Sequence, residues 1–352
     1  MAEGPVRSAR VAAVDCGTNS LRLLIADVDQ QSGVLTDVQR RMEIVRLGQG
    51  VDATGWLAPG PLARTFRVLE DYAAEVKSAG VTRVRMVATS ATRDAANAAE
   101  FVSGVTRILG IAPEVVSGDE EAFLSFTGAT AELAAPRRAA PAPRGTPSGV
   151  PAPSGRPEPP YLVVDIGGGS TEFVCGGGER HAADPVAALS VDIGCVRLTE
   201  RYLHGDPPRP GEIAAATAAI DAALGTVAAR IPAASARTLI GLAGSVTTVT
   251  GIALGLLAYE PARIHHARMP AGQVHDVTRM LLGQTRRERA AICVMHPGRV
   301  DVIGAGALVL DRVLDRLGFS EVMASEHDIL DGIARSIATG GTGAGCDGKR
   351  PG

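Results

Sequence analysis

The sequence predicts an α/β protein built from two domains, and three observations carry this prediction. The chain of 352 residues is longer than one ordinary hydrophobic core accommodates. Strand-like apolar runs alternate with amphipathic helix-like runs, which is typical of α/β units. One pattern also occurs twice, as VAAVDCGTNSLRLLIAD in the first half and as YLVVDIGGGSTEFVCGG in the second. Each copy combines a strand, an aspartate, a glycine-rich polar turn and a second strand, which indicates an internal repeat.

The first half of the chain opens with this repeat and continues as strands and helices. Residues 11–14 and 21–28 are extended apolar runs on either side of the polar turn, and MEIVRLGQGV is expected to contain a further strand. Residues 61–80 are expected to form a helix, because apolar residues recur on one face and Gly80 is a suitable C-terminal stop. The strand VRMVATSA, a helix that begins near Arg93, a short strand in EVVSG and a helix over 120–133 follow.

Composition changes sharply at residues 134–160, which are almost wholly Pro, Ala, Gly, Ser and Arg. Such a segment buries too little apolar surface to order itself, and proline favours extended conformations. We therefore predict a surface linker or disordered loop. A docking motif for a proline-binding module is the alternative.

The second half repeats the opening pattern from Tyr161 and then becomes mostly helical. We expect an alanine-rich helix at 211–230, a strand in TLIGLAGS, an apolar helix, and helices at 301–317 and 327–338. The predicted domains are residues 1–133 and 161–338, and the last helix is expected to pack on the first domain. Residues 339–352 are predicted to be a disordered tail.

Bulk properties limit the partners and the location of the protein. The formal net charge of −3 creates no general attraction to DNA, RNA or membranes, so a polyanionic substrate would need a local basic groove. The five cysteines show no metal-ligand spacing. The N-terminus lacks the apolar core of a signal peptide, and residues 241–258, the most membrane-like segment, are expected to form a buried helix. We therefore expect a cytoplasmic protein.

The two Asp–Gly turns are the strongest functional signal. Glycine lets backbone N–H groups approach a ligand, consecutive N–H groups and hydroxyls bind anions, and an aspartate at a strand end can hold a divalent cation. One such turn is equally well a structural hairpin, whereas two matching turns favour a cleft that grips adjacent phosphates from opposite walls. Neither turn is a Walker A loop or a Rossmann fingerprint. The candidates are Asp15, Gly17, Thr18, Asn19, Ser20 and Arg22 in the first turn and Asp165, Gly167, Gly168, Gly169, Ser170, Thr171 and Glu172 in the second.

An ordered series of motifs resembles the exopolyphosphatase and guanosine-pentaphosphate phosphatase (Ppx/GppA) family. The motifs are DCGTNSLRLLIADV, RLGQGV, VATSATRDAANAAEF, VVSGDEEAFLSFTGA, VVDIGGGSTEFV, DIGCVRLTERYL, GLAGSVTTV and SEHDILDGI. The compact length and the phrases GCVRLTERYLHGDPP and MHPGRVDVIGAGA resemble actinobacterial exopolyphosphatases. The resemblance implies two ribonuclease-H-like domains of the actin-like, sugar-kinase and Hsp70 superfamily, with the active site in the cleft between them.

The resemblance also implies roles for individual residues. It places the catalytic glutamate of the SGDEEA motif at Glu121, with Glu120 as the alternative register. From the sequence alone, these acids are better explained by a helix N-terminus, where the helix dipole stabilises them, and only the resemblance favours the catalytic role. Arg22 and Arg93 resemble the phosphate-contacting arginines of the family, as Arg side chains form bidentate hydrogen bonds to phosphate.

Metal ligands and further cleft positions are implied in the same way. Asp165 and Glu172 match the ligands of a divalent cation, Mg²⁺ or Mn²⁺, and Asp15 is a candidate from the opposite wall. Positions that resemble further cleft-lining residues are Gly194, Arg197, Gly244 and Ser245.

The implied activity is Mg²⁺-dependent release of terminal orthophosphate from inorganic polyphosphate, by water attack that Glu121 assists. The alternatives are a guanosine pentaphosphate (pppGpp) 5′-phosphohydrolase, a nucleoside triphosphatase, and a weakly active polyphosphate- or alarmone-binding sensor. One Trp and four Tyr favour a substrate without a base, because base binding needs stacking partners. The resemblance also implies a homodimer. No catalytic cluster is expected among the histidines, and the rings of the adjacent His265 and His266 are expected to point apart.

Overall fold

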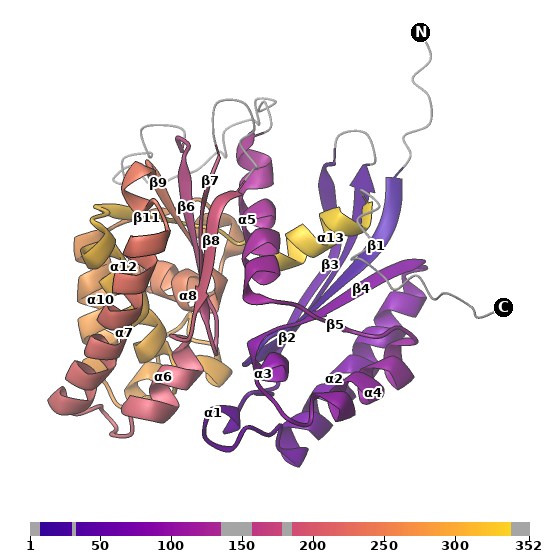
Figure 1. Cartoon of the computed structure of the whole chain (residues 1–352), viewed down its shortest axis with the longest axis horizontal. Coiled ribbons are helices and arrows are strands. Elements are labelled where there is room, and N and C mark those ends of the chain that lie inside the picture. The colour runs from indigo at the N-terminus through magenta and orange to yellow at the C-terminus, as the bar shows by residue number, and fades with distance from the viewer. Residues whose placement is uncertain (1–7, 30–32, 135–156, 178–184, 339–352) are drawn as a thin grey trace, which may run out of the picture.

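The computed structural model describes residues 8–29, 33–134, 157–177 and 185–338. It shows two lobes, each built on one β-sheet, with a pair of helices between the sheets (Figure 1). Most of the predicted linker and the whole predicted tail lie outside the described residues. The domain boundaries at residues 133 and 161 therefore stay predictions.

The first lobe contains a five-stranded sheet in the order β3-β2-β1-β4-β5. β1 pairs antiparallel with β2 and parallel with β4, while β3 is antiparallel to β2 and β5 is parallel to β4. Helices α2 and α4 cover one face, and the short helices α1 and α3 follow β3 and β4. The elements are β1 (Ser8–Cys16), β2 (Ser20–Asp29), β3 (Leu35–Ile44), α1 (Val51–Thr54), α2 (Pro59–Ser78), β4 (Arg83–Ala88), α3 (Ser90–Arg93), α4 (Ala98–Leu109) and β5 (Glu114–Val115).

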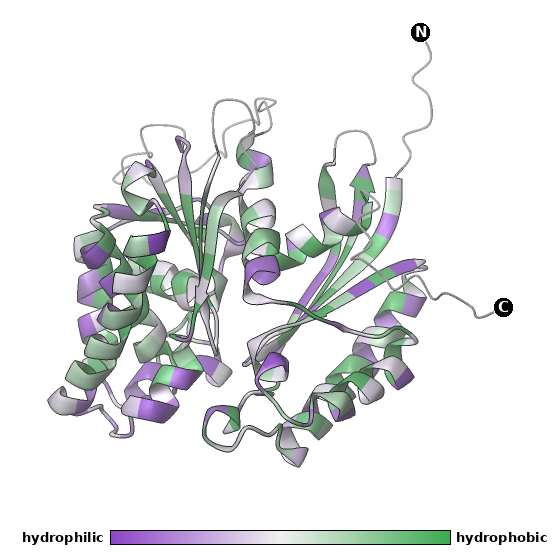
Figure 2. Ribbon diagram, in the orientation of Figure 1, coloured by the Kyte–Doolittle hydropathy of each residue, from purple (hydrophilic) through white to green (hydrophobic). Residues whose placement is uncertain are grey.

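The second lobe contains a six-stranded sheet in the order β10-β11-β9-β6-β7-β8. A large apolar core lies between this sheet and the helices on its outer face, and the hydrophobic strands of both sheets stand out in Figure 2. The strands are β6 (Tyr161–Ile166), β7 (Thr171–Gly176), β8 (Pro185–Val191), β9 (Thr238–Leu242), β10 (Arg268–Pro270) and β11 (Glu321–Ala324). The helices are α6 (Cys195–Tyr202), α7 (Pro210–Arg230), η1 (Ala233–Ser235), α8 (Ala243–Ala253), α9 (Pro261–Ile264), α10 (Ala271–Gly283), α11 (Arg286–Ala290), η2 (Pro297–Arg299) and α12 (Ile303–Leu317).

The two sheets share one topology. When the edge strand β10 is not counted, both sheets have the order 3-2-1-4-5 from the first strand of each repeat. β10 adds an antiparallel edge strand to the second sheet. The antiparallel hairpins β1–β2 and β6–β7 are the two copies of the repeated pattern, and each is continued by a parallel strand. This is the ribonuclease-H-like arrangement, so the predicted fold class is confirmed.

Two helices cross between the lobes. Helix α5 (Gly118–Ala134) packs on the second sheet, whereas α13 (Ile329–Ala338), from the C-terminal part of the chain, packs on the first sheet. The two helices meet closely at glycines. A Cβ atom on Gly128 would lie 2.7 Å from the carbonyl carbon of Asp328, and one on Gly332 would lie 2.8 Å from that of Leu124. Each lobe is thus covered by a helix from the other half of the chain.

Most predicted elements agree with the structure, with one exception near Arg93. The expected helices at 61–80, 211–230 and 301–317 correspond to α2, α7 and α12, and the apolar segment 241–258 contains the buried helix α8. The predicted start of a helix near Arg93 is wrong, because α3 ends at Arg93 and the next helix, α4, begins at Ala98.

Helix α7 is the one helix within the described ranges whose length and apolar composition would permit a membrane crossing. Length and composition are weak evidence for a span, because core helices share them. Here one face of α7 lies in the core of the second lobe, through Ala216, Ile220, Leu224 and Val227.

Candidate active site

The two glycine-rich turns have the same local structure and face each other across the cleft. The N–H of Gly17 donates to the carbonyl of Ser20 at 3.0 Å, and the N–H of Gly167 donates to that of Ser170 at 3.0 Å. A Cβ atom on Gly168 would lie 2.9 Å from Thr18 Cβ. The turns therefore approach more closely than a side chain at this position would allow.

A small cavity lies between the turns, and most of the predicted residues line it. Its walls include Ser90, Cys195 and Arg299, which the sequence did not single out. The predicted residues that line it are Asp15, Gly17, Thr18, Asn19, Ser20, Arg22, Glu121, Asp165, Gly167, Gly168, Ser170, Gly244 and Ser245.

The remaining predicted residues lie beside the cavity and not in its wall. The Thr171 hydroxyl donates to the carbonyl of Ile193 at 2.9 Å, so it supports the turn from within the lobe. Gly169 lines a separate small cavity on the other side of Thr18. Gly194 packs on the second turn so closely that a Cβ atom there would overlap the backbone of Gly168.

Four buried carboxyl groups gather at the site. Asp15 and Asp165 occupy equivalent positions in the first strands of the two repeats, and Glu172 is the cross-strand partner of Asp165. Ser125 donates to Asp165 at 2.7 Å and Ser190 donates to Glu172 at 2.7 Å. Glu121 enters from the first turn of α5, where the SGDEEA motif meets the cleft.

Burial makes these carboxyl groups difficult to ionise. It raises the pKa of Asp165 to about 6, with a further upward contribution from the Asp328 carboxylate. It raises the pKa of Glu172 to about 7, and neighbouring Asp165 adds to the shift. The pKa of Glu121 lies well above its usual range because of burial and the Glu172 carboxylate, while Arg93 opposes the shift. Such a site favours a bound cation or a retained proton.

Two predicted arginines contact these acids. Arg22 donates to Asp15 at 2.7 Å and also contacts Asp328 at the start of the α13 segment. Arg93 donates to the carbonyl of Val116 at 2.8 Å and lies 3.3 Å from Glu121. Arg22 therefore lies in the cavity wall, whereas Arg93 lies behind Glu121 and holds its side chain.

Arg299 is the functional candidate that sequence reasoning missed. Its half-buried guanidinium packs against Gly244 and donates to the Thr248 hydroxyl at 3.3 Å. No carboxylate of the described residues forms an ion pair with it, and burial lowers its pKa. The arginine after the Pro–Gly turn of HPGRVD is the local signal that points to it. A half-buried cation without a paired acid is suited to an anionic ligand.

Arg299 also connects the small cavity to a second, wider one of about 550 Å³. Arg22 and Gly244 line both cavities, so the two are adjacent. The second cavity has a mixed wall that includes Met42, Tyr259, Val294, Met295, His296 and Pro297.

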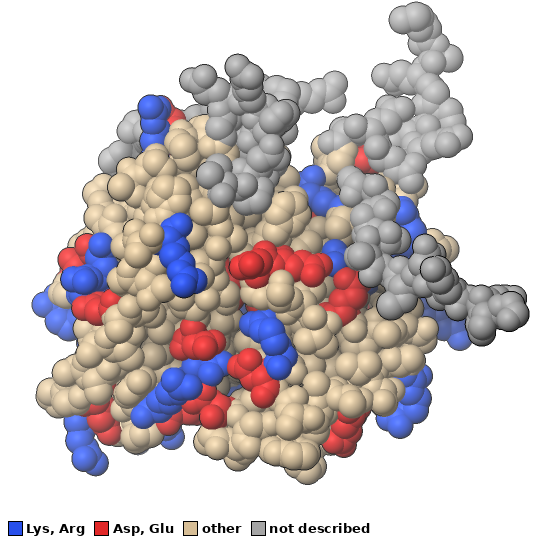
Figure 3. Space-filling model, in the orientation of Figure 1, with Lys and Arg blue, Asp and Glu red and all other residues tan. Residues whose placement is uncertain are grey.

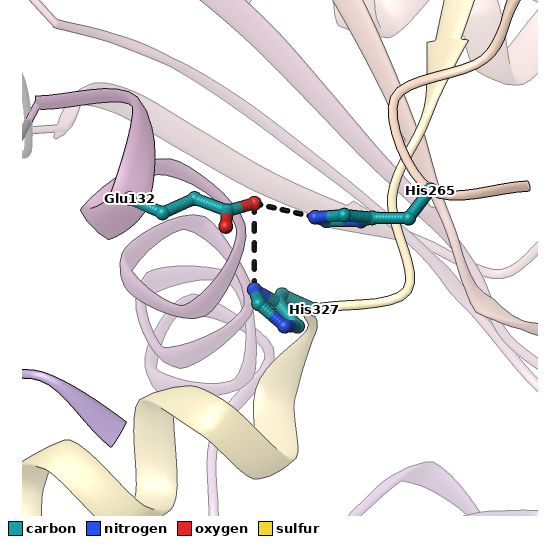
Figure 4. Close-up of side chains that lie close together, drawn as sticks. All are labelled: Glu132, His265 and His327. Atoms are coloured by element: carbon teal, nitrogen blue, oxygen red, sulfur yellow. Dashed lines mark ion pairs between the residues drawn. The ribbon is translucent and has the colours of Figure 1, made fainter. Parts of the chain in front are cut away.

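The histidines correct an expectation from the sequence. His265 and His266 do not point apart: their rings stack with centroids 3.8 Å apart, because His266 has a φ of 63°. Figure 4 shows that His265 and His327 both approach Glu132 near the end of α5. The Nε2 atoms of His265 and His266 lie 2.7 Å and 2.9 Å from Glu132 Oε1.

This histidine cluster has the residue types of a metal centre, but its hydrogen bonding favours a proton-linked contact. The N–H of Glu326 donates to His265 Nδ1 at 3.1 Å. A neutral His265 ring therefore carries its proton on Nε2, which lies 2.7 Å from Glu132 Oε1.

The protein has two ribonuclease-H-like lobes, and their glycine-rich turns and buried carboxyl groups meet at one cleft. This arrangement defines the two-domain actin-like class. The particular family follows from comparison with known proteins. The model of the Ppx/GppA phosphatase family matches residues 24–139 and 148–339, and the chain belongs to this family.

Individual relatives support this assignment. The chain is 47% identical to "Exopolyphosphatase 2" of Mycobacterium tuberculosis, over 94% of this chain and 98% of the relative. A crystal structure of an exopolyphosphatase-like protein is 40% identical with a TM-score of 0.84, covering 94% of this chain and 97% of that one. The Ppx/GppA family member of Aquifex aeolicus is 28% identical with a TM-score of 0.73, covering 94% and 97%. Both the sequence and the fold are therefore shared along almost the whole chain.

Proposed function

We propose that this protein is an exopolyphosphatase that releases terminal orthophosphate from inorganic polyphosphate. The observation that carries the proposal is that Glu121 and two facing anion-binding turns line one cavity. The similarity to a protein named exopolyphosphatase, across nearly the full length of both chains, supports the choice of substrate.

The chemistry assigned to the site is water attack on a terminal phosphoanhydride. The remaining N–H groups and the hydroxyls of residues 18–20 and 168–170 hold the non-bridging oxygens, and Arg22 and Arg299 offset their charge. Glu121 orients the water and accepts its proton as the bond to phosphorus forms. Arg93 fixes the Glu121 carboxylate from behind through its contact at 3.3 Å.

A divalent cation fits this set of residues. The Oδ1 atom of Asp15 is buried without a hydrogen-bond partner, and Asp165 and Glu172 add two buried carboxyl groups with raised pKa values. Oxygen ligands of this kind suit Mg²⁺ or Mn²⁺. When bound, the cation would neutralise charge on the phosphate oxygens.

A nucleoside polyphosphate such as guanosine pentaphosphate is the second candidate substrate. The wide cavity next to the site supports it, because Met42, Met295 and Pro297 provide apolar surface beside Tyr259. A nucleobase would use this apolar part of the wall, whereas a bare polyphosphate chain would contact only its arginines, Arg22, Arg40, Arg41 and Arg299.

The decisive experiment compares phosphate release from long-chain polyphosphate, guanosine pentaphosphate and ATP by the wild type, Glu121→Gln and Glu120→Gln. Glu120 is the matched control, because it is the neighbouring carboxylate and pairs with Arg85 at 2.9 Å, away from the cavity. We expect release from polyphosphate to fall by about 100-fold or more in Glu121→Gln and to change little in Glu120→Gln.

Three other results would change the proposal. Equal loss in both variants would remove Glu121 from its role. Faster release from guanosine pentaphosphate than from polyphosphate would favour the second candidate. Tight binding of polyphosphate without release, in the presence of Mg²⁺ or Mn²⁺, would identify a sensor. Addition of a chelator tests the cation: full activity in its presence would exclude a metal requirement.

A further inference from the structure

Arg197, on α6 of the second lobe, lies outside the cavity that it was expected to line and forms a three-way contact. Its Nε donates to the carbonyl of Gly169 at 2.7 Å, in the second glycine-rich turn. Its Nη1 donates to Asp52 at 2.5 Å and its Nη2 donates to Asp94 at 2.6 Å, both in the first lobe. The Arg197 side chain is only 11% exposed. One guanidinium thus joins a phosphate-binding turn to both α1 and the segment after α3.

Neighbouring residues of α6 strengthen this connection. Arg201 pairs with Asp52 as well, and the backbone N–H of Gly50 donates to Glu200 at 3.2 Å. The hydrogen bond from Arg201 and the charge of Arg197 lower the pKa of Asp52, so its carboxylate stays ionised. In Figure 3, acidic and basic side chains gather in the region where α6 faces α1 and α3. We call the set Asp52, Asp94, Arg197, Glu200 and Arg201 the clasp.

The clasp borders a small void that is separate from the wide cavity. Its residues Asp52, Asp94, Arg197 and Glu200 line this void of about 20 Å³ together with Thr18 and Gly169. Thr18 is the one described residue that this void shares with the central cavity, and none lines both the void and the wide cavity. The hydroxyl groups of Thr18 and Ser90 form a hydrogen bond of 2.8 Å. This contact completes the wall between the void and the central cavity. The central cavity therefore borders the wide cavity at Arg22, Gly244 and Arg299, and it borders the void at Thr18.

Arg197 also contacts residues that lie next to the site. Asp94 follows Arg93 directly, and Arg93 contacts Glu121. Gly169, which Arg197 holds, belongs to the turn that faces Thr18. A change at Arg197 is therefore transmitted both to the second turn and to the backbone next to the arginine that positions Glu121.

On this basis, and resting on the proposed function, we infer that Arg197 is a positioning and specificity-determining residue that closes the rear of the cleft. The substrate chain enters only through the wide cavity, and its free end stops against the turns. Only the terminal anhydride then reaches Glu121. Without Arg197 the Gly169 turn and the first lobe separate, and a chain can lie across the site so that an internal anhydride is exposed to the same water.

The test uses two polyphosphate probes, one with free ends and one with both terminal phosphates capped as phosphoramidates. The wild type is expected to cut the free-ended probe and to leave the capped one intact. Arg197→Met is expected to lower kcat on the free-ended probe by about 100-fold, because misplacing a site by about 1 Å has such an effect. The KM for that probe should change little, since the wide cavity still holds the chain. Arg197→Met should cut the capped probe at a measurable absolute rate, whereas the wild type does not, so the ratio of capped to free-ended cleavage should rise from zero.

The matched control is Arg312→Met, which removes a guanidinium paired with Asp221 at 2.8 Å within the second lobe. It should leave kcat and the ratio unchanged. An unchanged ratio in Arg197→Met, or cleavage of the capped probe by the wild type as fast as of the free-ended one, would overturn the inference.

If Arg197→Met cuts neither probe, hydrogen exchange measured without substrate decides the role of Arg197. Faster exchange at residues 167–171 and 50–54 than in the wild type and Arg312→Met would support the clasp, and unchanged exchange would overturn it. A wild type that releases no phosphate from polyphosphate would instead sink the proposed function, and the exchange measurement would still decide the role of Arg197.

Discussion

The close crossing of α5 and α13 makes Gly332→Ala an informative perturbation. The added Cβ atom would lie 2.8 Å from the carbonyl carbon of Leu124, and nearer still to its oxygen. Ordinary contacts of a Cβ atom begin at 3.4 Å, so the two helices would have to part by at least about 0.6 Å. The obstacle is helix backbone and not the end of a flexible side chain, so no local rotation relieves it.

Two effects of opposite sign compete in this variant. Replacing glycine by alanine inside a helix favours folding by about 0.5–1 kcal/mol. Overpacking of a close contact costs about 1–3 kcal/mol, and rigid backbone on both sides places this site at the upper end. We therefore expect a net loss of about 2 kcal/mol in the free energy of unfolding.

Gly225→Ala in α7 is the matched control, because nothing lies within 4 Å of a Cβ atom built there. It should gain about 0.5–1 kcal/mol through helix propensity alone. Urea unfolding of the wild type and both variants, followed by circular dichroism, measures the three free energies. If Gly332→Ala were as stable as the wild type or more stable, the helix crossing would not be packed as described.

The remaining predictions concern Arg299 and the histidine cluster. Arg299→Met should raise the KM for a polyanionic substrate by about tenfold without loss of stability, because the guanidinium has no paired acid. Steady-state kinetics and thermal unfolding measure the two effects. An unchanged KM would show that Arg299 does not contact the substrate. Glu132→Gln should lower stability by about 1–3 kcal/mol, since buried imidazole N–H groups would lose their acceptor. Burial alone would raise the pKa of Glu132, but the hydrogen bonds from His265, His266 and His327 hold it well below its usual value of 4.5, so its contribution is present above pH 4.5 and lost as pH falls through the depressed pKa. Burial lowers the pKa of His327, yet Glu132 and Asp331 raise it above 6.5 overall, so that contribution is complete below pH 6.5 and lost as pH rises through the raised pKa. The difference in melting temperature between the wild type and Glu132→Gln should accordingly be largest between about pH 4.5 and 6.5, and a difference that grows towards pH 9 would contradict this assignment.

Local sequence patterns were sufficient for the elements and for the residues of the two turns. Strand–Asp–Gly–strand patterns encode β1–β2 and β6–β7, since alternation, turn residues and glycine act over a few neighbouring positions. The repeat then implied that both lobes share one topology. The helix expected near Arg93 failed because α3 and α4 are separated by a short turn that periodicity does not resolve.

Contacts between distant segments could not be read in this way. Arg299 carries no local signal of burial, and its position depends on the approach of η2 to Gly244. Thr171 has the composition of a phosphate ligand, but its hydroxyl is used by the carbonyl of Ile193. The pairing of Arg197 with Asp52 joins residues 145 positions apart, and the sequence indicated only that Arg197 lay near a cleft.

By itself, the sequence determined the fold class, the two turns and the family, because each is encoded in short segments whose chemistry is local. Only the tertiary structure decided which side chains meet: Glu132 with three histidines, Arg197 with the first lobe, and α5 with α13 through their glycines. These contacts depend on how two lobes close on each other, and that packing is set by shape and burial summed over the whole chain.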